Sequence, residues 1–388
     1  MKVSLYVANK LLSSTSNTGK ITHIISVAGI SLGSFALIIS IAVLNGFENK
    51  LDEKISNFDG NIRVIGSVST KELSEIRSLK YLKSISEVNE RKGIINHSSD
   101  QSMVIFKQIN FDRLNNFYLL PYIGSLPKNN EILIGKDISS RLGVRIGDSV
   151  IISSPLDHSS IFGLYPSIKI KVSGIFQTKI LDYDNKYIFI SDSVGKNLFF
   201  NSPAASNLEI KLNDISKIDF VKKQLLDILE DRSRILSWRD ENLALVSAIW
   251  MEKIGSMIVL SLILFVASFS ILSTIHLVMM KKLKDIGILR LLGMNLNTTN
   301  NIIIFQALII GFKGAFVGIV LGVLIVFIQR VFNIISLPSE IYAMEVLPMI
   351  LNIRDIIAIL VINIFFIFFA GTLGVKKILK FDPIKFLK

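Results

Sequence analysis

The stretch "IGSMIVLSLILFVASFSILSTIHLVMM", residues 254–280, contains no Asp, Glu, Lys or Arg. A helix over this stretch rises about 40 Å, which is enough to cross the hydrocarbon core of a bilayer, about 30 Å thick. Charge returns abruptly in the next segment, "KKLKDIGILRLLGM", residues 281–294. The sequence therefore predicts a membrane span that ends at the water boundary near Lys281.

Other segments have the same character, because 50% of the 388 residues are apolar and the mean hydropathy is +0.53. We assign four transmembrane helices, to residues 21–47, 252–280, 299–330 and 355–375. Lys313 interrupts the third. A lysine exposed to lipid at mid-membrane costs about 3 kcal/mol, so Lys313 should face a polar cavity or a partner helix, or reach up to the membrane surface. The sequence leaves its role open.

Residues 48–251 have the composition of a water-exposed domain. Residues 47–250 contain 27 Lys and Arg against 25 Asp and Glu, whereas the rest of the chain contains 16 against 6. Alternating apolar patterns predict strands in "NIRVIG", "SMVIFKQI", "EILIG", "DSVIISS", "KIKVSGIF", "KYIFIS" and "LEIKL". Helices are expected near residues 71–79, 136–142 and 215–230. The predicted fold is an α-helical membrane protein with four transmembrane helices and a large extracytoplasmic α/β domain between the first and second.

The excess of basic residues predicts the orientation of the chain. Lys and Arg cluster in residues 1–20, 281–294 and 376–388, which the positive-inside rule places in the cytoplasm. Both termini should be cytoplasmic, with the domain of residues 48–251 and the loop of residues 331–354 on the other side. We expect residues 1–20 to lie at the membrane interface. Because the basic excess belongs to the membrane part, binding of nucleic acid is disfavoured.

The motifs of common enzymes are missing from the sequence. It has no Gly-x4-Gly-Lys-Ser/Thr loop for nucleotide phosphates, no cysteine, and its four histidines are too dispersed for metal-ligand spacing. We therefore expect no catalytic residue, no cofactor and no metal site.

Residues 281–294 allow two interpretations. Leu283, Ile286, Leu289 and Leu292 recur every three residues, and Gly293 follows as a helix-ending residue. The segment could be an amphipathic connector lying on lipid, or a helix that docks into another protein. Composition alone does not separate the two.

Small residues mark one face of two predicted spans. Gly314, Gly318 and Gly322 lie at four-residue spacing in the third span, and Gly29 and Gly33 form a shorter face in the first. Such faces let helices pack closely, and we expect these glycines to serve helix packing.

Several segments resemble lipoprotein-releasing system permeases, members of the MacB/FtsX-like superfamily of ABC transporter permeases. The resemblance covers nearly the whole chain. It is carried by residues 251–294 around "KDIGILRLLG", by "ISVAGISLGSFALIISIAVLNGFENKL" (25–51), "EILIGKDISSRLGVRIGDSVIISSP" (131–155), "VSGIFQTKILDYDNKYIFIS" (172–191) and "FDPIKFLK" (381–388). The Asn-Gly-Phe-Glu sequence after the first span favours the lipoprotein branch.

The resemblance implies a function and partners. The chain would be an inner-membrane permease subunit that extracts lipoproteins from the outer leaflet and passes them to a periplasmic carrier. A separate ATPase, in two copies, would drive it, and a second permease subunit, the same or a sister chain, would complete a dimer around membrane lipid and cargo. The implied coupling helix that contacts the ATPase contains Lys281, Lys282, Lys284, Asp285, Ile286, Leu289, Arg290 and Gly293.

A loop between two predicted strands is a further candidate for protein contacts. "SPLDHSSIFGLYPSI", bounded by Pro155 and Pro166, contains Phe162, Leu164 and Tyr165 near its tip. Related permeases that recruit a chaperone have a protruding Pro-bounded loop at this place. The alternative is an ordinary hairpin folded onto its own domain.

Two other functions fit the same resemblance. A MacB-like exporter normally carries a fused ATPase domain, which this sequence lacks. An FtsX-like regulator uses the same motion to activate a cell-wall hydrolase and transports nothing.

Overall fold

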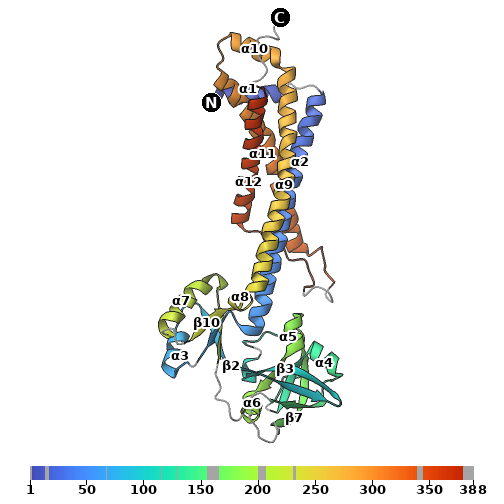
Figure 1. Cartoon of the computed structure of the whole chain (residues 1–388), viewed down its shortest axis with the longest axis vertical. Helices are drawn as coiled ribbons and strands as arrows, with labels where there is room; N and C mark the ends of the chain where they lie inside the picture. Colours follow the sequence, from blue (N-terminus) through green and yellow to red (C-terminus); the bar gives the residue numbers. More distant parts are fainter. Residues whose placement is uncertain are drawn as a thin grey trace. The chain divides into compact units, whose positions relative to one another are not determined.

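The computed structural model describes residues 2–13, 17–66, 68–114, 116–128, 130–154, 166–199, 207–229, 233–338 and 344–378. The chain divides into two compact units, which are described separately. The first contains residues up to Asn49, Ser247–Leu337 and Val346 onward; the second consists mainly of Lys50–Val246. Figure 1 shows the helices of the first unit and the mixed sheet of the second.

The first unit is a helical bundle. It contains a short helix, α1 (Lys2–Ser13), and four helices that are long and apolar enough to cross a membrane: α2 (Asn17–Asp59), α9 (Leu243–Lys281), α11 (Leu296–Phe332) and α12 (Ile353–Ile378). The remaining helix, α10 (Leu283–Leu291), joins α9 to α11. The four segments predicted to span the membrane therefore all form helices. Helix α2 continues well past Phe47, and α9 begins well before Ile254.

Glycines bring α11 and α2 into backbone contact. A Cβ atom added at Gly314 would lie 2.8 Å from the carbonyl oxygen of Val27, and one at Gly322 would lie 2.7 Å from the Ile38 side chain. Gly318 lies against Ser31 and Ser34 in the same way. The residue numbers of the contacts increase in the same direction along both helices, so α11 and α2 run parallel. Gly29 and Gly33 of α2 face Ala267 and Leu264 of α9 instead.

Hydroxyl and amide side chains also join the helices. The Ser26 hydroxyl lies 2.8 Å from that of Thr274 in α9, and Thr274 donates to the carbonyl oxygen of Thr22 at 3.1 Å. Ser34 donates to Asn363 Oδ1 of α12 at 2.9 Å. Where no water is available, such pairs satisfy polar groups and add specificity to the packing.

Asn45 and Gly46 form a contact point between α2 and the chain around α12. Asn45 donates to Asp355 Oδ2 at 2.7 Å and accepts from Lys253 Nζ of α9 at 2.6 Å. A Cβ on Gly46 would lie 2.9 Å from the backbone nitrogen of Met349 and closer still to the Pro348 carbonyl group. The Asn-Gly sequence is thus explained by geometry: Asn45 joins three segments, and Gly46 leaves room for the backbone of a fourth.

The second unit is built on one continuous sheet. Its strands are β1 (Ile62–Ile65), β2 (Leu82–His97), β3 (Asp100–Ile109), β4 (Tyr122–Gly124), β5 (Glu131–Gly135), β6 (Ser149–Ser153), β7 (Ser167–Phe176), β8 (Tyr187–Ser191), β9 (Asn207–Leu212) and β10 (Arg234–Ser237). The pairing order is β10-β1-β9-β2-β3-β8-β5-β7-β4, and β6 pairs with both β2 and β7. The helices are α3 (Thr70–Arg77), α4 (Lys136–Leu142), α5 (Leu181–Lys186), α6 (Asp192–Leu198), α7 (Ile218–Leu229) and α8 (Trp238–Glu241).

The long strand β2 belongs to two layers. Its first half pairs with β9, next to which β1 and β10 complete a sheet whose apolar side chains pack with those of α3 and α7. Its second half pairs with β3 and β6, and the pairings β2-β3-β8-β5-β7-β6-β2 close a barrel. Apolar side chains such as Phe106, Ile152 and Ile188 form the core associated with this barrel. Closure removes the exposed strand edges that invite aggregation.

The expected strands all form, but β2, β4 and β10 were not expected, and neither were helices α5 and α6. Strand β2 was missed because its sequence "LKSISEVNERKGIINH" is rich in charged and polar residues. Some of those face inward, for reasons given below.

We predict that Gly46→Ala destabilises the folded protein, because the new methyl group would meet backbone atoms that have no free rotation. Overpacking of this kind costs about 1–3 kcal/mol. The matched control is Gly255→Ala in α9, where nothing lies within 4 Å of the added atom. Thermal unfolding of the detergent-solubilised full-length protein, followed by size-exclusion chromatography, measures both. Equal unfolding temperatures for the two variants would contradict the assignment.

Candidate functional site

Helix α10 contains the charged and apolar residues of the implied coupling helix. Lys281 ends α9, Lys282 breaks the helix, and Lys282 Nζ lies 3.1 Å from Asp285 Oδ2. The chain then leaves α10 at Gly293, which has a φ of +100° and donates from its N–H to the Arg290 carbonyl oxygen. Only glycine adopts this φ without strain, so Gly293 permits the sharp return into α11.

The apolar side chains of α10 and the turn after it point in two directions. Ile286 is 3% exposed and packs in the bundle core. In contrast Ile288, Leu291 and Leu292 are 51%, 66% and 79% exposed. The three-residue periodicity indicated one apolar face that included Leu292, but Leu292 lies beyond the helix end and on the exposed side. A second apolar surface therefore remains uncovered beside the exposed Lys284 and Asp285.

Two open grooves follow α9 on its exposed side. The first, about 520 Å³, is lined by α9 residues Ile254, Met257, Ile258, Ser261, Leu262 and Phe265 and by Phe366 of α12. The second, about 550 Å³, is lined by Phe269, Leu272, Ser273, His276, Leu277, Met280 and Lys281. The lining is overwhelmingly apolar in the first groove and becomes more polar in the second. Such a surface suits hydrocarbon chains better than a polar solute.

The proposed chaperone-contact loop joins β6 to β7. These strands pair as an antiparallel hairpin, with Ser153 opposite Ser167. Pro155, Phe162, Leu164 and Tyr165 lie outside the described residues, and Pro166 directly precedes β7.

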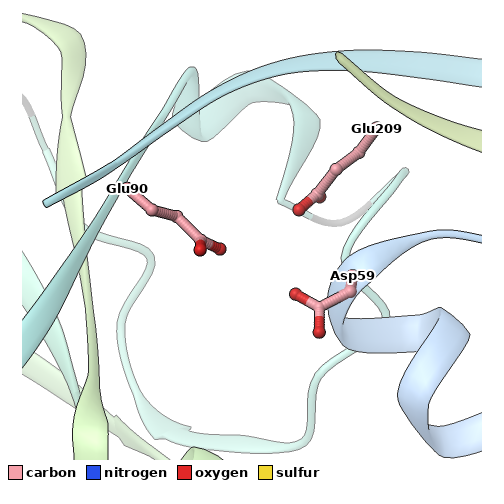
Figure 2. Close-up of side chains that lie close together, drawn as sticks. All are labelled: Asp59, Glu90 and Glu209. Carbon is pink, nitrogen blue, oxygen red and sulfur yellow. The ribbon is translucent and has the colours of Figure 1, made fainter. Parts of the chain in front are cut away.

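The second unit contains a buried cluster of charged side chains that the sequence analysis did not find. The carboxylates of Asp59, Glu90 and Glu209 come from α2, β2 and β9 and converge on one space (Figure 2). Three carboxylate oxygens this close together could in principle bind a metal ion. The Lys107 ammonium, from β3, takes the position between the carboxylates that a metal ion would need. It lies 2.6 Å from Asp59, 2.8 Å from Glu209 and 3.6 Å from Glu90.

A second cation completes the cluster. The Arg63 guanidinium lies 2.8 Å from Asp59, 2.9 Å from Glu209 and 3.1 Å from Glu90. Tyrosines satisfy the remaining carboxylate oxygens: Tyr183 donates to Asp59 Oδ2 at 2.6 Å and Tyr118 donates to Glu209 Oε2 at 2.8 Å. The geometry explains why the cluster is a structural ion network rather than a metal centre.

The pKa values of the two deepest carboxyl groups move in opposite directions. Burial opposes ionisation of Asp59, but Lys107 and Arg63 outweigh it and hold its pKa below the ordinary value. For Glu209, burial prevails over the same two cations and raises the pKa to about 7. Three carboxylates share two cations, so one carboxyl group accepts a proton most readily, and it is Glu209.

Charged residues inside apolar strands were the available signal for this cluster. Lys107 interrupts "MVIFKQI", and Glu209 sits in the centre of "LEIKL". Each residue alone is compatible with a solvent-facing position in an alternating strand. Only the arrangement of β3, β9 and β2 in the folded sheet places them together. The sequence pattern therefore could not predict which charged residues pair with one another.

We predict that Glu209→Gln removes a pH dependence from the stability of the second unit. Because the folded-state pKa lies above the ordinary 4.5, the contribution of Glu209 is fully present below about pH 4.5 and is lost as pH rises through about 7. Unfolding temperature should fall with rising pH across this range in the parent and less in the variant. The fluorescence of Trp238, measured in a Trp250→Phe background, gives the unfolding temperature of the second unit. The control is Glu87→Gln, which changes an exposed residue on β2 and should keep the pH dependence of the parent protein. If both variants show the same pH dependence of the unfolding temperature, Glu209 is not its source.

Both units of the chain are similar to known protein families. Residues 24–228 match the model of the MacB-like periplasmic core domain, and residues 257–383 match that of the FtsX-like permease C-terminal domain. The lipoprotein-releasing system transmembrane protein LolC of Xylella fastidiosa (strain 9a5c) is 24% identical over 94% of this chain and 92% of that protein. LolE of Haemophilus influenzae is 24% identical over 93% of each chain. The solved periplasmic region of MacB from Actinobacillus actinomycetemcomitans aligns with 51% of this chain and 98% of that chain, with 10% identity and a TM-score of 0.34.

The two family models agree with the structure, in which four helices suited to a membrane accompany an α/β unit. The first family model alone covers more than half of the chain. The chain therefore belongs to the MacB/FtsX-like family of permeases, and its similarity to LolC and LolE proteins extends along both units.

Proposed function

We propose that this chain extracts lipoproteins from the outer leaflet of the inner membrane and hands them to a periplasmic carrier. The observation that carries the proposal is the similarity to lipoprotein-releasing proteins along 94% of the chain, which includes both units. The chain would work in a dimer with a second permease subunit, the same or a sister chain. Both termini and α10 would face the cytoplasm, and the second unit the periplasm.

The apolar grooves along α9 support a lipid-modified cargo. Removing an acyl chain from the bilayer forfeits about 0.8 kcal/mol for each CH₂ group, so extraction needs both work and an apolar surface that shields the chain. The groove from Ile254 to Phe265 offers such a surface. In a dimer, the exposed faces of α9 and α2 would line the cavity that receives the acyl chains.

The work would come from a separate ATPase subunit, two copies of which would bind the permease dimer. Helix α10 offers the contact, because Ile288, Leu291 and Leu292 are exposed while Ile286 anchors the same helix in the bundle core. A push on α10 would therefore move the helices packed around Ile286. Exposed apolar residues clustered at a short helix end are typical of a protein contact.

Two continuous helices would carry the motion outward. Helix α2 runs without interruption from Asn17 to Asp59, and α9 from Leu243 to Lys281. Asp59, at the last position of α2, is bound by Lys107 and Arg63 of the β-structure. In addition, Asp52 of α2 accepts from Arg239 of α8 at 2.9 Å. These ion pairs thus attach the end of α2 to strands β3 and β1.

The proposal is tested by release of a fluorescent triacylated lipoprotein from proteoliposomes that contain this chain, its ATPase and its partner permease. Release should require ATP and a soluble acceptor. If ATP is hydrolysed and no lipoprotein leaves under any condition, the transport function fails. Activation of a cell-wall hydrolase by the same particles would then favour a regulator of the FtsX type.

We predict that Leu291→Asp combined with Leu292→Asp abolishes co-purification with the ATPase subunit, because two carboxylates would have to be buried in the contact. The matched control is Ile334→Asp, which changes an equally exposed apolar residue after α11. Both variants should remain monodisperse in detergent. Retention of the ATPase by the double variant would show that α10 does not bind it.

We also predict that Leu262→Asn slows lipoprotein release several-fold while ATP hydrolysis continues, since it places an amide in the apolar groove. Leu324→Asn on α11 is the control: Leu324 is exposed to a similar degree but lines neither groove. Initial release rates at fixed ATP give the comparison. Equal rates for the two variants would exclude the groove as the path of the acyl chains.

A further inference from the structure

The lysine within α11 lies on an exposed face. Lys313 is exposed, and Phe312 and Phe316 beside it are 59% and 60% exposed. Its neighbour Gly314 points the other way, into the contact with α2. Among the described residues, none forms an ion pair or a hydrogen bond with the Lys313 ammonium. Its counter-charge therefore comes from outside the described part of the chain.

The parallel packing of α11 on α2 sets the depth of Lys313. Gly314 meets α2 at Val27 and Ile30. His23 is four residues before Val27, which is about 6 Å of helical rise. Helical side chains lean toward the N-terminal end of their helix, and a lysine stem extends roughly 6 Å. The Lys313 ammonium therefore reaches the level of His23.

The basic groups at this level share one face. His23, Val27 and Ile30 fall at helical spacing on α2, and Lys20 lies one turn further toward the N-terminal end. Lys20 is exposed and His23 is half-buried. Lys20 also marks the end of the charge-free run of α2, so Lys20 lies at a boundary of the hydrocarbon core, and Lys313 extends toward it from within the span.

Neither helix offers a carboxylate to these basic side chains. Residues 17–47 of α2 contain no Asp or Glu, and α11 contains none along its whole length. A lysine that faces lipid and reaches the interface finds phosphate groups there. Basic pockets between transmembrane helices on the cytoplasmic side bind anionic lipid head groups.

We propose that Lys20, His23 and Lys313 form a binding site for the head group of an anionic phospholipid on the exposed side of the contact between α2 and α11. The phosphate contacts the Lys313 ammonium and the His23 and Lys20 side chains, and the acyl chains lie along Phe312 and Phe316. The bound lipid supplies the negative charge that the two helices lack. The site is independent of the cargo and of the proposed transport function.

The test is titration of the purified full-length protein with phosphatidylglycerol, phosphatidylcholine of the same acyl chains, and glycerol phosphate, followed by native mass spectrometry. The parent should bind phosphatidylglycerol in preference to phosphatidylcholine. Lys313→Leu should weaken phosphatidylglycerol binding about fivefold and leave phosphatidylcholine unchanged. Lys313→Arg should retain the preference. Binding of glycerol phosphate as tight as that of the lipid would show a site for free phosphate and overturn the proposal.

Arg330→Leu is the matched control, because it removes one exposed cation from the other end of the same helix. It should leave phosphatidylglycerol affinity unchanged. If it weakens binding as much as Lys313→Leu does, the effect is one of general charge and the site does not exist. Should Lys313→Leu fail to fold, the double variant Lys20→Gln with His23→Gln must show the same loss; parent-like affinity in that variant contradicts the proposal.

Discussion

The ion pair between Asp59 and Lys107 joins the longest helix of the chain to the β-structure. Both side chains are buried, and their distance of 2.6 Å is that of a charge-assisted hydrogen bond. Burial makes the pair weak as a source of net stability but costly to break, since either partner alone would be an unpaired buried charge. Helix α2 therefore cannot detach from β3 without a large penalty. The end of α2 is thus fixed to the strands of its own unit, which the proposed transmission of motion along this helix would require.

Much of the fold was predictable, because the bilayer and the pleated sheet impose simple periodicities. Charge-free runs mark α2, α9 and α12, an apolar run interrupted only by Lys313 marks α11, and alternating apolar residues mark strands such as β3 and β5. Strand β2 escaped because it serves two layers and contributes Glu90 to the ion network, so its polar residues are not confined to the solvent side. Short elements such as β4 and β10 depend on their partner strands and have little pattern of their own.

Some features of the candidate site could likewise be predicted from the local sequence, whereas others depend on the tertiary structure. The composition of α10 and the turn at Gly293 are visible in the sequence, because both are local properties. The exposure of Leu291 and Leu292 is not, since it depends on which side of α10 the bundle covers. Similarly, the carboxylates of Asp59 and Glu209 are far apart in sequence and meet only through the pairing of β1 with β9. A motif of neighbouring residues could not encode that cluster.

The contacts within the bundle follow the cost of burying different groups. In the middle of α11, glycines allow backbone approach to α2 and require no hydrogen-bond partner. Near the Asp355 end of the bundle, charge is tolerated, and Asn45 joins Lys253 to Asp355 through hydrogen bonds of 2.6 and 2.7 Å. Close glycine packing and a few buried hydroxyl and amide hydrogen bonds hold the middle of the bundle, whereas charged groups take part in the contacts near Asp355. Hydrogen bonds from Asn45 to both Lys253 and Asp355 therefore fix α2, α9 and α12 relative to one another at this end, where the proposed transmission of motion along α2 would need a defined register.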